Sequence, residues 1–448
     1  METTMQLSIS DRFNYSRLLR FTFPSVVMML FTSIYVIADG FFVSNFVGKT
    51  ALASVNFAYP ILMILGCIGF MFGTGSSALI SKKLGEGQEK EASDIFSFII
   101  IFSLILGVAL TVIGLLFIED ILVLMGATGE LLENSTIYAK IIVSCLPFYI
   151  LQYEFQCLLV TADKPRLGLV VTVLAGLTNI VFDALFIVVF KWGITGGAAA
   201  TAMSQVVGGL VPLIFFLRKN NSSRLRIRTG FKWDWKALGK ICGNGSSEFM
   251  SNVASSIVSA VYNLQLLKYS GEDGLAAYSV IMYVGIVFVS LFIGYSVGSA
   301  PIIGYNYGAK DHDHLRKITK ESFVIITVQS VCMLAFSYVM ARPLGLVFVS
   351  YDKVLLEFTI HAFRLYSISF LFCGFSIFSS AFFTALNNGL VSALISFLRT
   401  LVFQILCILV IPVFLGSDGI WIATAVAEFL SLIFSLIFVF ANKKKYHY

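Results

Sequence analysis

Charged side chains are scarce in this chain: Asp, Glu, Lys and Arg make up 12% of the 448 residues, whereas hydrophobic residues make up 58%. Soluble globular proteins carry about 25% charged residues, so this composition excludes that class. The seven cysteines are scattered and show neither a disulfide framework nor a metal-binding spacing. The polar segments are too short for a separate catalytic domain, and no GxxxxGKS or GxxxxGKT motif occurs, which argues against a single-chain ATP-driven pump.

The hydrophobic residues are gathered in long runs, and a helix needs roughly 20 apolar residues to cross the hydrocarbon core of a bilayer. Each run is therefore predicted to be a transmembrane helix, which makes the chain an all-α membrane protein with twelve spans. The runs lie near residues 17–43, 53–80, 94–117, 134–159, 166–190, 193–217, 240–267, 275–303, 317–341, 357–383, 389–414 and 418–441.

The two halves of the chain match without a gap when the sequence is shifted by 223 residues. Matched pairs include Gly48 with Gly271, Gly193 with Gly416, and Thr201 with Thr424. Each half holds six runs, and an even number of spans returns the chain to its starting side, so the two copies have parallel topology. We predict two six-helix lobes, 1–217 and 240–448, related by a pseudo-twofold axis along the membrane normal and joined by a flexible basic linker at 218–239.

The basic residues predict the orientation in the membrane. Of the 31 Lys and Arg residues, 23 lie in one alternating set of polar segments, five lie in the other set, and three lie inside spans. Basic segments stay cytoplasmic, so both termini are predicted to be cytoplasmic in the plasma membrane of a prokaryotic cell. This topology and contact with anionic lipid explain the net charge of +6 without a nucleic-acid partner.

Three polar residues of the first half have no acidic or amide counterpart in the second half. The shift pairs Asp39 with Tyr262, Asn179 with Val402 and Asp183 with Leu406, whereas Thr201 meets Thr424. An aspartate near the centre of a membrane helix costs roughly 2.5–3.5 kcal/mol on insertion, so it persists where it faces a cavity or a partner. Asn179 and Asp183 are four residues apart and share one helix face. All four first-half residues are expected at similar depth in the outer half of the membrane.

The chemistry of these side chains favours a small cation. Two carboxylates, an amide oxygen and a hydroxyl are hard oxygen ligands, which suit Na⁺ or a proton rather than a soft metal. Two close carboxylates at low dielectric also favour sharing one proton. We therefore predict a cation-coupling site, in a wet pocket of the first lobe, formed by Asp39, Asn179, Asp183 and Thr201. The alternative is a hydrogen-bond network that only holds the helices together.

Other polar residues inside the spans are secondary candidates. Glu248, Gln205 and Glu154 are candidates for a substrate site or a second proton site. For Glu248 the alternative is a solvated residue at the opening between the lobes, and for Glu154 it is helix packing. Arg399 is expected to form an ion pair with Glu428 rather than a binding site.

A hinge and a loop are predicted from the local sequence. Pro24 lies on the same predicted helix as Asp39 and is a candidate hinge, since proline removes a helix hydrogen bond and favours a bend. The string from Asp311 to His314 resembles a metal-binding tract, but the sequence offers no further ligands beside it. We predict that it is a solvated cytoplasmic loop.

Four segments in combination resemble the multidrug and toxic compound extrusion (MATE) family of transporters, over essentially the whole chain. They are IYVIADGFFVSNFVG in the first span, LGEGQEKEA in a cytoplasmic loop, LTNIVFDALF in the fifth span and GITGGAAATA in the sixth. The resemblance implies export of cationic or amphipathic organic compounds in exchange for H⁺ or Na⁺, with no cofactor besides the coupling ion. A monomer is expected.

The resemblance also suggests roles for individual residues. The set Asp39, Asn179, Asp183 and Thr201 matches the first-lobe cation site of the DinF-like branch. Glu248 matches the seventh-span glutamate of the NorM-like branch. The tenth span has no aspartate where that branch carries one, which argues against a sodium site in the second lobe.

The predicted function is secondary active multidrug efflux by cation antiport with alternating access. A lipid-linked saccharide flippase of related architecture is one alternative, but it would need several basic residues in the first-lobe cavity, where Lys140 is the single candidate. A second alternative is an intramembrane aspartyl hydrolase that uses Asp39 and Asp183 as a carboxylate pair. A passive channel is the third.

Overall fold

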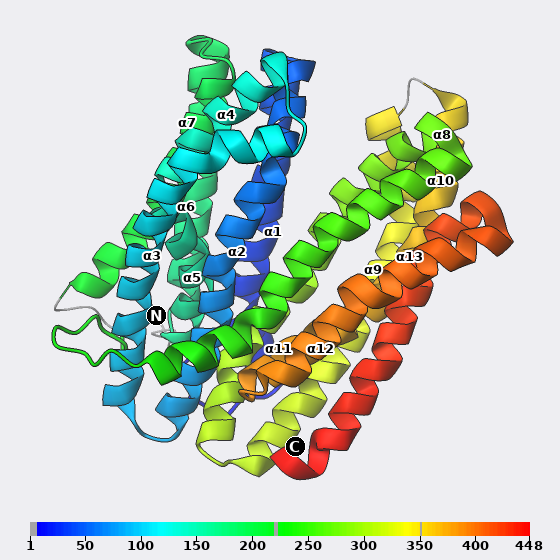
Figure 1. The fold of residues 1–448 in the computed structure, drawn as a ribbon. Coiled ribbons are helices and arrows are strands. Elements are labelled where there is room, and N and C mark those ends of the chain that lie inside the picture. Colours follow the sequence, from blue (N-terminus) through cyan, green and yellow to red (C-terminus); the bar gives the residue numbers. More distant parts are fainter. Residues whose placement is uncertain (1–6, 219–222, 350–351) are drawn as a thin grey trace, which may run out of the picture.

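Helices make up the regular secondary structure of the described part of the chain, which comprises residues 7–218, 223–349 and 352–448 of this computed structural model (Figure 1). In chain order they are α1 (Tyr15–Phe42), the π-helical η1 (Val43–Val47), α2 (Lys49–Gly85), α3 (Glu89–Leu124), α4 (Gly129–Ser144), α5 (Leu146–Thr161), α6 (Pro165–Asp183), π-helical η2 (Ala184–Val189), α7 (Ile194–Leu217), α8 (Trp235–Gly308), α9 (His312–Val349), α10 (Lys353–Ser367), α11 (Phe370–Ala385), α12 (Gly389–Phe397), π-helical η3 (Leu398–Phe403) and α13 (Gln404–Tyr446).

The predicted arrangement of twelve spans is recovered from these helices. By length and hydropathy alone, eight helices of the described chain qualify as spans, and ten qualify when the bent pairs α4–α5 and α10–α11 each count as one. The long helices α8 and α13 each contain two spans, because their backbones leave the helical region at Gly271 and Gly416. The first part of α8 is not among the qualifying spans because it is rich in polar residues, including Asn244, Glu248, Ser251, Asn252 and Ser255.

The duplication is visible in the backbone angles. Gly193 and Gly416, which are 223 residues apart, have nearly identical values (φ 60°, ψ −138° and φ 60°, ψ −136°). Each precedes the last span of its lobe, and glycine adopts this positive φ without steric cost. The turns after α5 and α11 depart from the gapless repeat, because their positive φ angles fall at Asp163 and Asn387, which are 224 residues apart.

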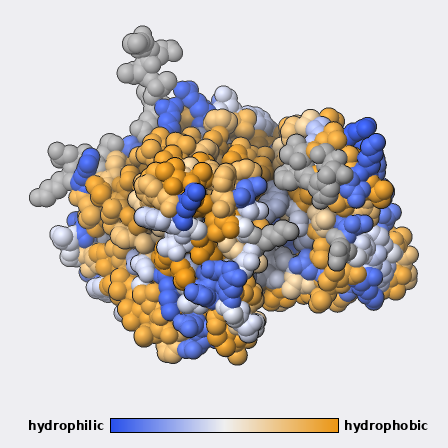
Figure 2. Space-filling model, turned by 90° about the horizontal axis from the view of Figure 1, so that it is seen from above, coloured by the Kyte–Doolittle hydropathy of each residue, from blue (hydrophilic) through white to orange (hydrophobic). Residues whose placement is uncertain are grey.

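The two lobes contact each other at one end of the molecule and separate toward the other end (Figures 1 and 2). Contact is made by α1 and α2 of the first lobe with α8 of the second. A Cβ atom on Gly245 would overlap the backbone of Met71, and one on Gly308 would overlap the backbone of Lys82. Glycine therefore allows the lobes to close at this end, which we term the basic end because Lys82 and Lys310 lie there.

The outer faces of the helices carry many exposed apolar side chains. On α3, Val108, Val112 and Leu116 succeed one another at four-residue spacing and are 55%, 55% and 67% exposed. Such a stripe would be an unusually large apolar patch on a soluble protein, whereas in a bilayer it contacts acyl chains. The chain is a multi-pass membrane protein.

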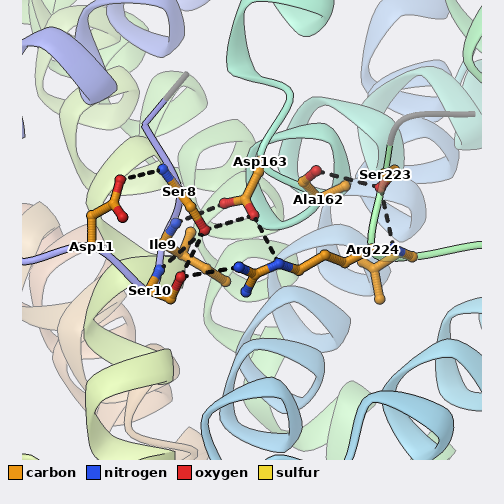
Figure 3. Close-up of polar contacts among 9 residues, drawn as sticks. Ser8, Ile9, Ser10, Asp11, Ala162, Asp163, Ser223 and Arg224 are labelled. Carbon is orange, nitrogen blue, oxygen red and sulfur yellow. Dashed lines mark hydrogen bonds and ion pairs between the residues drawn. The ribbon is translucent and has the colours of Figure 1, made fainter. Parts of the chain in front are cut away.

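The segment that precedes α1 is bound to the first lobe at the basic end (Figure 3). The carboxylate of Asp163, in the turn after α5, accepts hydrogen bonds from Ile9 N at 2.7 Å and Ser8 Oγ at 2.9 Å. Arg224, from the connection between the lobes, lies 3.9 Å from the same carboxylate and donates to Ser10 Oγ at 3.2 Å. Burial raises the pKa of Asp163, and these donors offset part of the rise.

The connection between the lobes was predicted to be flexible, but its described part is packed against α3. Leu225 is fully buried, and Ser97 Oγ accepts a hydrogen bond from Arg228 N at 2.9 Å. Its apolar side chains explain the difference. Of the polar residues that suggested flexibility, 220–222 lie outside the described residues, whereas Ser223 is buried and donates a hydrogen bond to the Ala162 carbonyl at 3.4 Å. The first helix of the second lobe begins at Trp235 rather than at the predicted residue 240.

The string predicted to be a solvated loop instead leads into α9, and His314 is buried there. Its Nε2 accepts a hydrogen bond from Phe13 N at 3.1 Å. Within the described residues, no group of three metal-ligating side chains is found. The histidine therefore ties the N-terminal segment to the second lobe, so this segment contacts both lobes at the basic end.

We expect acidification to release this contact. Burial lowers the pKa of His314, opposed by the charge of Asp311 and assisted by those of Lys317 and Arg12. Only the neutral ring can accept the hydrogen bond from Phe13 N. The stability that this hydrogen bond adds is therefore fully present above the unfolded-state pKa of about 6.5, and it is lost as the pH falls through the lower folded-state pKa. Hydrogen-exchange protection at Phe13 N should therefore fall on acidification.

The matched control for this measurement is Leu18 N, which bonds to the Asn14 carbonyl at 2.8 Å within α1 and involves no titrating group. Its protection should stay constant across the same pH range. Constant protection at Phe13 together with constant protection at Leu18 would contradict the assignment.

Candidate functional site

The four residues predicted to form a cation site come together in the first lobe. Asp39 is on α1, Asn179 and Asp183 are on α6, and Thr201 is on α7. Thr201 Oγ1 donates a hydrogen bond to Asp39 Oδ1 at 3.3 Å, and Asn179 Nδ2 donates to Thr201 Oγ1 at 3.5 Å. Three helices are thus joined through one chain of polar atoms, and we call these four residues the carboxylate cluster.

Asp183 is the most buried member of the carboxylate cluster. It is 0% exposed, Asn179 is 1% exposed, and Asp39 is near enough for the two carboxylates to interact electrostatically. Both carboxylate oxygens of Asp183 and Oδ1 of Asn179 lack a hydrogen-bond donor among the described residues. Buried acceptors of this kind are stable when a proton or a cation sits between them.

Tyr138 belongs to this site and was missed in the sequence analysis. It lies on α4, is 4% exposed, and has Asp39, Thr201 and Asp183 as polar neighbours. Its counterpart under the 223-residue shift is His361, which is exposed and bonded to Asp418 at 3.0 Å. This difference between the halves was readable in the sequence, but the direction of the tyrosine side chain was not.

The wet pocket around the carboxylate cluster stays a prediction. Three prominent cavities of the described chain are lined by other residues than these four. The first-lobe cavity is small, about 10 Å³, whereas those of about 240 and 150 Å³ are lined mainly by the second lobe. Within the carboxylate cluster, Asp183 and Asn179 are enclosed by packed helices, whereas Asp39 and Thr201 are partly exposed.

Gln205 lies one turn beyond Thr201 on the same face of α7. It is 5% exposed and its Oε1 has no donor among the described residues. The next polar group in this direction is Gln152 of α5, which packs against Gly208 and donates to Tyr35 Oη at 3.5 Å. Within the first lobe, a line of buried polar side chains therefore extends from the carboxylate cluster through Gln205 to Gln152.

Glu154 does not join that line. It is 0% exposed, and its neighbours are Ser103 on α3 and Gly73 on α2. Glu154 is two residues from both Gln152 and Gln156 on α5, so it points to the opposite side of that helix. The structure thus separates Glu154 from the carboxylate cluster, and a role for it in a substrate or proton site stays a prediction.

Glu248 lines the largest cavity, of about 240 Å³, between α2, α8, α11 and η3. Its side chain has no hydrogen bond within the described residues, and Arg399 is the charged residue that influences it. Arg399 forms the predicted ion pair with Glu428: its Nε lies 2.9 and 3.1 Å from the two carboxylate oxygens. The arginine borders both large cavities.

The second lobe closes its copy of the carboxylate cluster with neutral groups. Tyr262, the counterpart of Asp39, forms a buried hydroxyl–hydroxyl hydrogen bond with Thr424, the counterpart of Thr201. A phenol and a threonine satisfy one another without an ion, whereas a carboxylate and a threonine leave a negative charge. Lys140, the basic candidate for a flippase cavity, is exposed and paired with Glu119 at 3.0 Å.

The fold and the site together define a class of protein: a duplicated, helical membrane transporter with two neighbouring carboxylates in one lobe and the two larger cavities mainly in the other. A family model described as MatE matches residues 24–185 and 249–410, once in each lobe and over more than half of the chain. The chain belongs to the MatE family. Family membership makes it a transporter rather than an enzyme, which excludes the hydrolase considered above.

Individual relatives agree with this assignment. The chain is 26% identical over 367 residues to multidrug export protein MepA of Staphylococcus saprophyticus, covering 80% of both proteins. It is 28% identical over 321 residues to MepA of Staphylococcus haemolyticus, covering 71% of this chain and 70% of that protein. Its fold matches the outward-facing conformation of a multidrug resistance MATE family transporter with a TM-score of 0.91, at 24% identity, over 99% of this chain and 100% of that one.

The Arg399–Glu428 pair is expected to be important for stability. The side chains are 17% and 6% exposed, and removing one partner of a buried pair leaves an uncompensated charge, which costs about 3–5 kcal/mol. Arg399→Gln should therefore lower the thermal unfolding temperature of the purified protein, and the double variant Arg399→Gln/Glu428→Gln should recover most of the loss. A double variant as unstable as the single one would show that the pair is not the cause.

Proposed function

We propose that this transporter exports small amphipathic or cationic organic compounds by antiport against H⁺ or Na⁺. Family membership and the similarity to two MepA multidrug export proteins support the substrate class. The geometry of the carboxylate cluster supports ion coupling. The assignment to the DinF-like branch stays a prediction.

One observation carries the ion-coupling proposal. Asp183 is fully buried beside Asp39, and neither oxygen of Asp183 has a hydrogen-bond donor among the described residues. A buried, unpaired carboxylate is unstable, so the site favours a proton or a small cation. Asn179 Oδ1 and Thr201 Oγ1 add neutral oxygen ligands, and an all-oxygen set fits H⁺ or Na⁺.

Alternating access follows from the way the lobes pack, given the predicted orientation. If the basic end is cytoplasmic, the lobes are closed on that side and separated on the outer side. An ion from outside would then reach the carboxylate cluster as the substrate leaves. Because a ligand shifts a conformational equilibrium only by binding one state more tightly, ion binding must favour a first-lobe conformation with weaker substrate affinity.

Pro24 is placed to convert ion binding into helix bending. It is buried within α1, fifteen residues before Asp39, or about 22 Å along a helix. Its neighbours Ser25 and Val26 lie against Gly294 of α8 at the interface between the lobes. A bend of α1 at Pro24 would therefore move the cluster end of the helix relative to this interface.

The central test is efflux from vesicles containing the purified protein. With ethidium as substrate, we expect wild-type efflux to follow an imposed pH or sodium gradient, each applied separately. Asp39→Asn should remove the dependence on the gradient because it removes the charge that the ion neutralises. Asp418→Asn is the matched control, since that carboxylate is exposed and its pair with His361 contributes little.

The Asp39→Asn result decides the role of the carboxylate cluster. An Asp39→Asn protein that exports ethidium at the wild-type, gradient-dependent rate would refute it. Efflux by the wild type that never exceeds equilibration, whatever gradient is imposed, would instead indicate a passive channel.

Substitution of Pro24 tests the hinge separately. Pro24→Ala restores a backbone donor in α1 and should favour the straight helix by about 1 kcal/mol, which corresponds to roughly fivefold slower turnover. Ethidium binding to the purified protein should change little, because Pro24 borders none of the three cavities. Unchanged turnover would remove Pro24 from the mechanism.

A further inference from the structure

The largest cavity contains two side chains of opposite charge. Glu248 approaches it from the first part of α8, and Arg399 approaches it from η3. Glu248 is within electrostatic range of Arg399, yet no ion pair forms between them. The cavity therefore has one anionic and one cationic group on its wall.

Both groups have free hydrogen-bonding capacity toward the cavity. Arg399 uses Nε to bind Glu428, and neither of its Nη atoms has a hydrogen-bond partner among the described residues. The Glu248 carboxylate likewise has none, and its oxygens are not among the atoms sealed from solvent. A guanidinium with both Nη groups free presents a fork that matches a carboxylate or phosphate.

The rest of the wall is suited to polar organic groups. Hydroxyl and amide side chains from α2, α8 and α11 line the cavity, including Ser77, Ser251, Asn252 and Ser380. The second cavity, of about 150 Å³, shares Ser255, Val289, Arg399 and Thr400 with the first, so the two adjoin. Tyr278 and Tyr366 line that second part and offer aromatic surface.

We propose that the second-lobe cavity binds zwitterionic compounds, with the basic group of the substrate at Glu248 and its carboxylate at the Nη groups of Arg399. This assignment rests on the proposed export function and narrows its substrate class. A cation without an acidic group would use Glu248 alone. Arg399 thus adds selection for amphoteric molecules to a site whose acidic residue would otherwise select only for positive charge.

Glu428 controls how strongly Arg399 can bind the carboxylate of a substrate. Its contact with Nε orients the guanidinium and neutralises its charge when no substrate carboxylate is present. This explains how a nearly buried arginine is tolerated beside a cavity, because an unpaired charge there would be costly. Removing the Glu428 charge should make Arg399 a stronger anion-binding group, since the substrate carboxylate would then be its only counter-charge.

The test is a binding comparison of two dyes that differ in one group. Rhodamine B carries a free carboxylate, and rhodamine B ethyl ester carries the same cationic ring system with that carboxylate esterified. Fluorescence polarisation with the purified full-length protein gives a Kd for each. We expect wild-type protein to bind rhodamine B at least as tightly as its ester.

Three variants separate the two charges. In Arg399→Gln/Glu428→Gln, which removes the ion pair as a unit, rhodamine B should bind about tenfold more weakly relative to its ester, as expected for a lost charge-assisted hydrogen bond. Glu428→Gln alone should shift this ratio in the opposite direction. Glu248→Gln is the matched control: it should weaken both dyes equally, because they share the cationic ring system.

The outcomes are distinct from those of the efflux experiment. Wild-type protein that binds the ester but not rhodamine B, or a Kd ratio that is unchanged in Arg399→Gln/Glu428→Gln, would overturn the zwitterion assignment and leave the export proposal intact. Failure of the export proposal would appear as dye binding without gradient-driven efflux. Binding of the ester in each variant reports that the protein is folded.

Discussion

The meeting of two carboxylates among three helices, one fully and one partly buried, is the constraint on which the first lobe depends. Asp39 and Asp183 approach one another from α1 and α6, and Asp183 is sealed from solvent without a donor of its own among the described residues. Thr201 and Asn179 supply two hydrogen bonds but no positive charge. The packing of α1 against α6 and α7 is therefore sensitive to the presence of a cation, which is the property a coupling site requires.

The two lobes have the same fold, but one equivalent position packs helices together in the first lobe and borders cavities in the second. In the first lobe this position is Gly176, where an added Cβ would lie 2.6 Å from a ring atom of Phe31, so α1 and α6 pack closely. In the second lobe it is Arg399, whose long side chain occupies the space between the corresponding helices and borders both large cavities. Duplication thus produced one lobe packed around carboxylates and one lobe with room for a ligand.

The sequence predicted the features that depend on hydrophobic length and on internal comparison. The twelve spans, the duplication and the meeting of Asp39, Asn179, Asp183 and Thr201 followed from these, as did the Arg399–Glu428 pair. Features that depend on side-chain direction were not predictable in this way. Tyr138 was missed because one tyrosine does not reveal which way its helix face points.

The location of open space was also beyond the sequence. The sequence predicts a wet pocket beside the carboxylates because buried charge usually implies water, but it gave no sign of the cavities of about 240 and 150 Å³ that the second lobe mainly lines, since cavity volume depends on how closely whole helices pack. Likewise, the buried ring of His314 accepts a hydrogen bond from the backbone of Phe13, three hundred and one positions earlier. Such long-range contacts leave no local pattern in a sequence.

The carboxylates do not line the three cavities. In the proposed antiport, the ion and the substrate would therefore not compete for the same atoms. Under that proposal their coupling has to pass between the lobes, and α1 is the helix that connects the relevant parts. One end of α1 carries Asp39, and Val26 near the middle of the helix contacts Gly294 of α8. The same stretch of α8 carries Ile293 and Val297 on the cavity wall. A change in α1 caused by ion binding would therefore reach the wall of the second-lobe cavity through one packed interface.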